Sequence, residues 1–347
     1  MAAETFTTLS GALNKIFEGE LASQIPRLVT TAGALPKKPI NSYQVAWDAR
    51  LGTTAATAES DGASISTYNS DTKAPATLPV GTYQDSFKIN GRLTAAVQAA
   101  GTAAIRDLYA EQVMESLERV ASKINVDLYS GTGSTSDPIT IAGLNQVALL
   151  ADTGTYANIS RNTYAQWKSN VLSNTGTPRA LSVQLMRDMM RTIYVASGGR
   201  PNIITCDPVT YEYYGLTFGP YRQWIDEVNV GGETVKLDAG FKALSFDGIP
   251  VVQDRDCVAG TMNFLDTTNN VMIRTLAPAP SQVENAQGEA EAMGAPAFDS
   301  SGATGIRARI QELARDGDFR VFQVLTYVQL QVRSPNRCGV LKDLLTS

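Results

Sequence analysis

The sequence predicts a mixed α+β fold for the 347-residue chain. Apolar residues recur at helical spacing over 95–129 and alternate at strand spacing over 320–332. Between these stretches, residues 140–275 alternate short helical patterns with short strand patterns. We therefore expect one long helix and one comparably long strand that pack along each other, with a mixed α+β domain between them in sequence.

Residues 1–40 have the pattern of an N-terminal arm. Between 6 and 25, apolar residues follow the spacing of a short amphipathic helix: Leu9, Leu13, Ile16, Phe17 and Leu21. Three prolines, Pro26, Pro36 and Pro39, then punctuate an extended stretch. The same pattern is equally typical of an ordinary N-terminal helix packed on the core, so both alternatives stay open.

Residues 41–92 have the pattern of an extended loop. Tyr43, Val45 and Trp47 alternate with smaller or polar residues, as in a strand, and 87–89 is a second short strand. Residues 52–81 between them are rich in Thr, Ala, Ser, Asp and Gly and offer little to bury. Such a loop is unusual inside a compact domain. We interpret it as a two-stranded excursion whose partner lies on another subunit; a disordered surface loop is the alternative.

The helix over 95–129 is the clearest element. One face carries an apolar residue every three or four positions: Ile105, Tyr109, Val113, Leu117, Val120, Ile124 and Leu128. Glu115 and Arg119 form a favourable i,i+4 pair, and Gly131 and Gly133 follow the helix end. At ~1.5 Å per residue the rod is about 50 Å long. Because the heptad pattern is not strict, we interpret it as a structural spine and not as a coiled coil.

The middle of the chain contains several shorter elements. We expect helices over 161–173, from a Ser182 cap through 195, and from an Asp207 cap over 209–214. Strands are expected over 201–206 and after the turn at 246–249. A strand pair is expected at 262–265 and 271–276, joined by 266–270.

The last third combines a low-complexity stretch, 277–305, with the long strand over 320–332. One face of that strand carries Phe322, Val324, Thr326, Val328, Leu330 and Val332. The other face carries Gln323, Gln329 and Gln331. Thirteen residues at roughly 3.3 Å each span about 40 Å, which is comparable to the helix.

Composition excludes several classes of protein. The net charge is −5, from 29 basic and 34 acidic residues, which argues against a dedicated nucleic-acid binder. There is no histidine, so serine–histidine and cysteine–histidine nucleophile systems are excluded. Cys206, Cys257 and Cys338 lie far apart and are expected to be free thiols of a reducing compartment. No signal peptide or membrane-spanning stretch is recognisable, so we expect a protein made in a cytoplasm.

Several short motifs are similar to functional sites, but the predicted structure around them does not fit those functions. The glycines of 131–133 follow a helix and not a strand, so they do not form a dinucleotide loop. The carboxylates of 254–256 are interpreted as a turn, and the aromatic residues of 211–224 as packing residues. Asn158 begins an N-glycosylation motif, but because we expect no secretion, we expect no glycosylation there. We predict no catalytic, cofactor-binding or metal-binding residues, no cofactor and no enzyme activity.

The order of elements, together with five segments, resembles the major capsid proteins of tailed bacteriophages, whose fold is shared with the herpesvirus capsid floor and with encapsulins. The segments are AESDG at 58–62, PATL at 75–78, DLYSG at 127–131, RPNIIT at 200–205 and FDGIPVV at 246–252. The last, followed by Asp254 and by the strand at 262–265, carries most of the resemblance. The resemblance as a whole covers nearly the whole chain.

The resemblance implies a tailed-phage major capsid fold with a defined division. It implies that residues 1–40 form an N-terminal arm and that 41–92 form an extended β-hairpin loop. Residues 93–145 and 272–330 would form a peripheral domain, with the spine helix about 95–129 and the long strand about 320–332. Residues 146–271 and 331–347 would form an axial domain. The arm and the loop would contact neighbouring subunits. Residues 277–305 would be a variable peripheral insertion.

The resemblance also implies function and partners. The chain would be a structural subunit that self-assembles into pentamers and hexamers of an icosahedral head enclosing double-stranded DNA. Because no long N-terminal scaffolding segment is present, a separate scaffolding protein is expected, together with a portal protein and a cement protein. Packaged DNA would be contacted weakly and membranes not at all. The virion would be assembled in the host cytoplasm.

Two further points concern covalent links between subunits and the rival functions. Some members link their subunits covalently through lysine and asparagine. Here Lys73 is the only lysine of residues 52–81 and has no matched site, so we expect no such links. Two rival functions are an encapsulin-type nanocompartment shell, which has the same fold, and a soluble α+β enzyme, which the absence of histidine disfavours.

Overall fold

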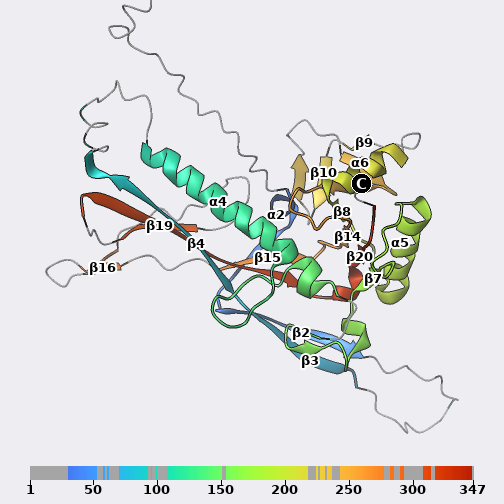
Figure 1. The fold of residues 1–347 in the computed structure, drawn as a ribbon. Coiled ribbons are helices and arrows are strands. Elements are labelled where there is room, and N and C mark those ends of the chain that lie inside the picture. The colour runs from blue at the N-terminus through green and yellow to red at the C-terminus, as the bar shows by residue number, and fades with distance from the viewer. Residues whose placement is uncertain are drawn as a thin grey trace, which may run out of the picture.

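The computed structural model contains two main sheets, of five and seven strands, and one long helix (Figure 1). The described residues are 30–52, 58, 61, 70–92, 95, 99, 108–150, 154–217, 224–225, 227–230, 233–236, 243–276, 282–284, 290–292, 308–313 and 317–345. The predicted helix between 6 and 25 lies outside them. The mixed α+β class predicted from the sequence is confirmed.

The five-stranded sheet is built around the predicted long strand, β19 (Phe319–Val332). β4 (Gly81–Asn90) pairs with β19 over residues 319–328. The other edge of β19 carries β18 (Ala308–Glu312) and then β15 (Val271–Leu276), since both overlap positions that β4 occupies on the first edge. β1 (Lys37–Ile40) completes the sheet by pairing in parallel with β15. β19 therefore connects elements from both ends of the chain.

The two faces of β19 differ less than the sequence predicts. The expected apolar face is buried from Phe322 to Val332. The opposite face was expected to be polar, yet Gln329 and Gln331 are buried as well. The Gln329 amide donates to the carbonyl oxygen of Pro79 at 2.6 Å and accepts from the amide of Ala142 at 2.9 Å. Its polar groups are satisfied inside the core, which is why a glutamine is tolerated there.

The spine helix is α4 (Leu108–Ser130), with the C-terminal end one residue beyond the predicted one. Most of the expected first part, 95–107, lies outside the described residues. Where side chains are described, the predicted stripe is buried: Val113, Val120, Ile124 and Leu128, with Leu117 partly buried. α4 packs along β4 and β19, as expected of the long helix and the long strand.

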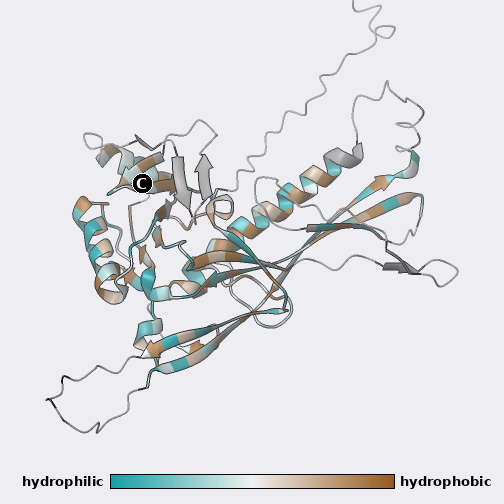
Figure 2. Ribbon diagram, turned by 180° about the vertical axis from the view of Figure 1, so that it is seen from behind, coloured by the Kyte–Doolittle hydropathy of each residue, from teal (hydrophilic) through white to brown (hydrophobic). Residues whose placement is uncertain are grey.

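The extended loop is a β-hairpin, but its second strand differs from the predicted one. β2 (Gln44–Gly52) pairs with β3 (Thr72–Pro79), whereas residues 87–89 belong to β4 and pair with β19. Hydrophobic and hydrophilic residues alternate along the hairpin (Figure 2). Val45 and Trp47 are buried as expected, but Tyr43 precedes the strand and is 74% exposed. Ala76, Leu78 and Val80 are also buried, so 52–81 buries more than its composition indicates.

The end of the predicted N-terminal arm packs on the body of its own subunit. Residues 30–40 contain α2 (Thr31–Ala34) and β1, and Ala32, Leu35 and Ile40 are buried. The extended stretch expected around Pro36 and Pro39 is thus a short helix followed by a sheet strand. Residues 1–29 lie outside the described chain.

The seven-stranded sheet collects strands from the middle and the end of the chain. In spatial order they are β7 (Asn170–Leu172), β20 (Gly339–Leu341), β14 (Met262–Leu265), β8 (Ile203–Cys206), β13 (Ile249–Gln253), β12 (Ala243–Phe246) and β9 (Trp224–Ile225). One face packs on α5 (Val183–Ser197) and α6 (Pro208–Thr217). The other face joins the core that contains α4.

The predicted N-caps of α5 and α6 are confirmed, whereas the helices end two and three residues beyond the predicted positions 195 and 214. The Ser182 hydroxyl accepts the Leu185 amide at 3.2 Å, and Gly198 ends α5 with a φ of 66°. The Asp207 carboxylate accepts the Thr210 amide at 3.2 Å and caps α6. The tight turn between β12 and β13 is also confirmed, with positive φ at Asp247 and Gly248.

Two further predictions are wrong. Residues 161–173 are not a helix: a 3-10 turn, η3 (Ala165–Trp167), buries Trp167, and β7 then pairs with β20. β14 and β15 do not pair with each other, because β14 lies between β20 and β8 while β15 lies between β1 and β19. The segment 266–270 therefore carries the chain from one sheet to the other.

The remaining elements are short. They are η2 (Leu144–Ala148), β5 (Thr155–Tyr156), β6 (Ile159–Ser160), β10 (Glu227–Val230), β11 (Glu233–Lys236), β16 (Gln282–Glu284), β17 (Ala290–Ala292) and η5 (Pro335–Arg337). β16 and β17 pair within the stretch 277–305, most of which is outside the described residues.

Candidate functional site

No group of three or more Cys, Asp or Glu side chains lies together to hold a metal ion in the part of the chain that the structure describes. The three cysteines are free, as predicted, and all three are buried. Burial raises the pKa of Cys257 and of Cys338 to about 12, so neither is a thiolate near neutral pH. The candidate functional elements are therefore structural: the hairpin root, the spine helix, and the junction of the two sheets.

The hairpin root is held by three aromatic rings. Trp47 of β2 lies 6.5 Å from both Tyr156 and Trp167, measured between ring centroids, and those two rings stack at 5.9 Å. The Trp47 indole donates to the carbonyl oxygen of Arg333 at 3.3 Å. The Tyr156 hydroxyl accepts the amide of Val332 at 2.9 Å. The hairpin is thereby fixed to the end of β19.

A buried arginine supports this aromatic cluster. Arg161 is 1% exposed, and its guanidinium lies 5.6 Å from the Tyr156 ring centroid. It donates to the carbonyl oxygens of Val147 and Ala148 at 2.6 and 3.1 Å. Burial raises the pKa of the Tyr156 hydroxyl. The root is thus a packed, hydrogen-bonded base from which the hairpin projects.

The spine helix is fixed to β4 by three hydrogen bonds. Asp85 accepts the Ser116 hydroxyl at 2.7 Å and the Arg119 guanidinium at 2.9 Å. The Tyr83 hydroxyl of β4 donates at 2.9 Å to Asp127, which lies about one turn before the end of α4. Burial raises the pKa of Tyr83 well above its usual value, so the hydroxyl stays a donor. These contacts fix the position of the helix along the strand.

Asp254, which the sequence places in a turn, joins three regions. Its carboxylate is buried and accepts the backbone amide of Thr31 at 3.0 Å and the Asn125 amide at 3.0 Å. The amide of Asp256 donates to it from within the turn, also at 3.0 Å. The turn prediction is confirmed, but the sequence did not indicate that the turn connects the N-terminal segment, the spine helix and β13.

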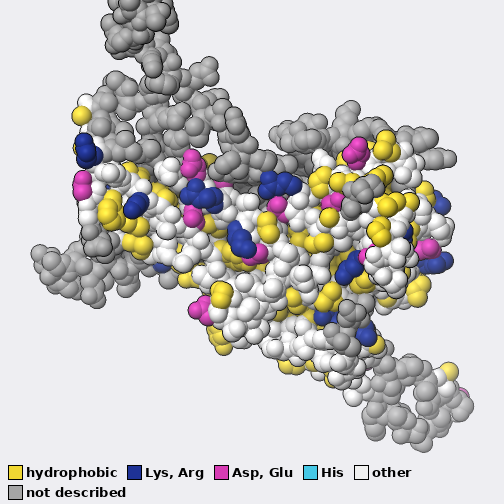
Figure 3. All heavy atoms as spheres, viewed as in Figure 1, with side chains coloured by type: hydrophobic (Ala, Val, Ile, Leu, Met, Phe, Trp, Pro, Cys, Tyr) yellow, Lys and Arg dark blue, Asp and Glu magenta, His cyan; other side chains and the backbone are white. Residues whose placement is uncertain are grey.

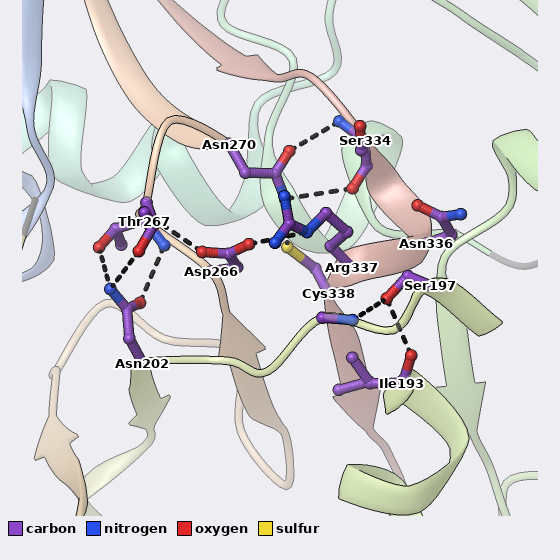
Figure 4. A network of polar contacts seen from close by, with 12 residues as sticks. Ile193, Ser197, Asn202, Asp266, Thr267, Asn270, Ser334, Asn336, Arg337 and Cys338 are labelled. Atoms are coloured by element: carbon purple, nitrogen blue, oxygen red, sulfur yellow. Dashed lines mark hydrogen bonds and ion pairs between the residues drawn. The ribbon is translucent and has the colours of Figure 1, made fainter. Parts of the chain in front are cut away.

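The junction between the sheets is a polar network (Figure 4). Asp266, at the end of β14, lies 3.0 Å from the Arg337 guanidinium, and burial raises its pKa. Asn270 donates to the Ser334 carbonyl oxygen at 3.1 Å and accepts the Ser334 amide at 2.7 Å. Both chain crossings between the sheets, 266–270 and 333–338, are therefore bonded to each other.

A cleft of about 380 Å³ lies between the hairpin root and this junction. Its walls carry Trp47 and Arg50 from β2, Asn269 from the first crossing, and Arg333 and Arg337 from the second. Arg50 is paired with Asp71 at 2.7 Å. The cleft is polar and carries no catalytic arrangement among its lining residues.

The other motifs examined in the sequence are structural. Gly131 packs so closely on the carbonyl oxygen of Ile141, 2.4 Å from where a Cβ would lie, that only glycine fits. Of the aromatic residues over 211–224, Tyr214 is buried and its hydroxyl donates to the Ser245 carbonyl oxygen at 2.7 Å. The side chains of Tyr221 and Trp224 lie outside the described part.

A hairpin, a spine helix along a long strand, and a second sheet with helices on its outer face define the class: a shell subunit with the tailed-phage major capsid fold. The chain belongs to the SU10 major capsid protein family, whose model matches residues 8–293. It is therefore a structural subunit of a phage head. The predicted family resemblance is confirmed.

Solved structures agree on the fold. A chain of the cyanophage A-1(L) capsid asymmetric unit is 21% identical, with a TM-score of 0.73, covering 98% of this chain and 99% of that one. A chain of the capsid of an empty GTA particle is 12% identical, with a TM-score of 0.64 and coverage of 99% and 100%. The SrpI encapsulin of Synechococcus elongatus is 10% identical, with a TM-score of 0.59 and coverage of 100% and 98%.

No curated protein matches the chain. Family membership supports a structural, non-enzymatic role in the capsid. Among the described helices, none has both the length and the apolar character needed to cross a membrane.

Proposed function

We propose that copies of this chain assemble into the pentamers and hexamers of an icosahedral phage head that encloses double-stranded DNA. The observation that carries the proposal is the family match over 8–293, together with nearly complete coverage of a cyanophage capsid chain. The similarity to a GTA capsid computed with five-fold symmetry supports ring assembly. Closed shells of this kind need contacts that repeat around each axis.

We assign 93–145 with 272–330 to a peripheral domain and 146–271 with 331–347 to an axial domain. The two crossings between the sheets, at 266–270 and 333–338, support this division because they fall close to its internal boundaries. Residues 1–40 act as an arm and 41–92 as the loop toward neighbouring subunits. Residues 31–40 of this arm pack on the subunit's own body.

The partners follow from this role. The subunit works with a separate scaffolding protein, a portal protein and a cement protein, and it assembles in the host cytoplasm. Its net charge of −5 supports weak contact with packaged DNA, since tight phosphate binding requires a basic excess. The chain performs no catalysis.

The second candidate is an encapsulin-type shell. The similarity to the SrpI encapsulin over the whole chain favours it, at a lower TM-score than the cyanophage capsid chain. A soluble α+β enzyme is disfavoured by the absence of histidine and by the family.

Co-expression with a candidate scaffolding protein, followed by negative-stain microscopy, separates these functions. Large shells that form only with the scaffolding protein are the result we expect. Small uniform shells formed by the chain alone would favour the encapsulin. A folded monomer or dimer that assembles under no condition would contradict both.

A further inference from the structure

Exposed hydrophobic side chains gather on the two outer helices of the seven-stranded sheet. Eight large hydrophobic residues are exposed among those described, and four of them are on α5 and α6: Tyr194, Val195, Val209 and Leu216. In the space-filling view, hydrophobic side chains gather at the end of the molecule that carries these helices (Figure 3). Large exposed apolar side chains that gather on neighbouring turns of a helix indicate an interaction surface.

The exposed face of α5 is basic and aromatic, and we call it the α5 stripe. Arg187, Arg191, Tyr194 and Val195 follow one another at helical spacing, opposite the buried side chains that face the sheet. Tyr194 is 66% and Val195 79% exposed. Asp188, beside the stripe, is paired with Arg191 at 2.9 Å. The stripe therefore keeps a net positive charge through Arg187.

The exposed face of α6 is acidic and aliphatic, and we call it the α6 stripe. Val209, Glu212 and Leu216 lie on one side of the helix, and Leu216 is 68% exposed. Tyr214 lies on the opposite side and is buried against the sheet. The α6 stripe thus has the charge sign opposite to that of the α5 stripe.

The two stripes are separate surfaces of one subunit. α5 packs against β7 and β20 at one end of the sheet, whereas α6 packs against β13 toward the other end. If the α5 stripes of two copies packed on each other, Arg187 and Arg191 of one copy would face the same arginines of the other. Like-charge repulsion disfavours that contact. A pairing of α5 with α6 places a cation and an anion around a shared apolar contact. Such a head-to-tail contact repeats around a ring.

We propose that the α5 stripe of one copy packs against the α6 stripe of the next copy around the pentamer and hexamer rings. This inference rests on the proposed function, since it identifies a contact by which the rings close. The partner is a second copy of this chain. The interface core is Tyr194 and Val195 against Val209 and Leu216, with Arg187 and Glu212 at its rim.

Paired cysteines test the contact in the assembled protein. The variant Y194C/L216C places one thiol on each stripe, and both positions are exposed enough to leave the fold intact. The three native cysteines are buried, so a bismaleimide reacts with the introduced thiols first. Shells assembled from this variant should give, on a denaturing gel, a ladder of cross-linked chains that ends at five or six copies.

The single variants Y194C and L216C, and the unchanged chain, are the matched controls and should remain monomeric on the same gel. A dimer from either single variant would show like stripes in contact and would overturn the inference. Shells without a ladder from the double variant would also overturn it, while leaving the proposed function standing. Failure of the unchanged chain, co-expressed with the scaffolding protein, to form shells by microscopy would instead contradict the proposed function.

Discussion

The backbone amide of Thr31 donates a 3.0 Å hydrogen bond to the carboxylate of Asp254, across 223 positions of sequence. The Asn125 side chain of the spine helix donates to the same carboxylate at 3.0 Å. Three regions of the chain, the N-terminal segment, the spine helix and the seven-stranded sheet, therefore meet at one buried acceptor. Removing that acceptor should loosen all three.

We expect Asp254→Ala to lower the free energy of unfolding by about 2–4 kcal/mol, because it leaves the backbone amides of Thr31 and Asp256 without their acceptor. Urea unfolding of the unassembled subunit measures this. The control, Asp61→Ala, removes an exposed carboxylate and should change the free energy by less than about 0.5 kcal/mol. Equal unfolding midpoints for the two variants would show that Asp254 has no such role.

The Tyr83 hydroxyl should contribute measurably to the position of the spine helix. It donates to Asp127 and accepts the amide of Ile141 at 3.3 Å. Tyr83→Phe leaves both groups without this partner, so we expect a loss of about 1–3 kcal/mol in urea unfolding. Tyr194→Phe makes the same chemical change at an exposed site and should be close to neutral; a similar loss there would contradict the assignment.

Elements with strong local signals were predictable from the sequence. The stripe of the spine helix, the alternation of the long strand and the Ser182 and Asp207 caps each depend on residues near one another in sequence. Strand pairing was not predictable in this way. β14 and β15 look like a hairpin locally, yet each finds its partners far away, because both edges of each strand are taken by other segments.

The candidate site shows the same limit. The alternation at 43–47 predicted a strand containing Trp47, and the residues 254–256 predicted a turn. That Trp47 packs on Tyr156 and Trp167, and that Asp254 binds Thr31, depends on contacts separated by more than 100 positions. Only the folded chain brings them together. The prediction of a helix over 161–173 was wrong for the same reason. Trp167 is buried by residues outside that segment, and a local pattern does not show such contacts.

The hairpin root should depend on Trp47. Replacing this buried side chain by alanine removes the indole from the aromatic cluster and its hydrogen bond to Arg333, and we expect a loss of about 3–5 kcal/mol in unfolding free energy. Limited proteolysis should then cut between β2 and β3 sooner. Tyr43→Ala, at the exposed position just before the strand, is the control. Unchanged cutting and stability in W47A would exclude the proposed anchoring.

Asp343 should make the subunit sensitive to acid. Its pKa is lowered because its carboxylate accepts the Ser173 hydroxyl at 2.6 Å and the Asn174 amide at 2.7 Å. A carboxyl with a lowered folded-state pKa stabilises the fold above its unfolded pKa of about 3.9, and that stability is lost as the pH falls through the folded value. We therefore expect Asp343→Asn to melt at a lower temperature at pH 7 and to converge with the unchanged chain in acid. A difference that is constant with pH would contradict this assignment.

The central claim is that the chain builds a closed shell, and a cryo-electron microscopy reconstruction of its assembled particles tests it most directly. We expect an icosahedral shell whose pentamers and hexamers are made of this chain, with the hairpin in contact with a neighbouring subunit. Particles with another symmetry, or a folded subunit that stays monomeric with every scaffolding protein tried, would contradict the claim.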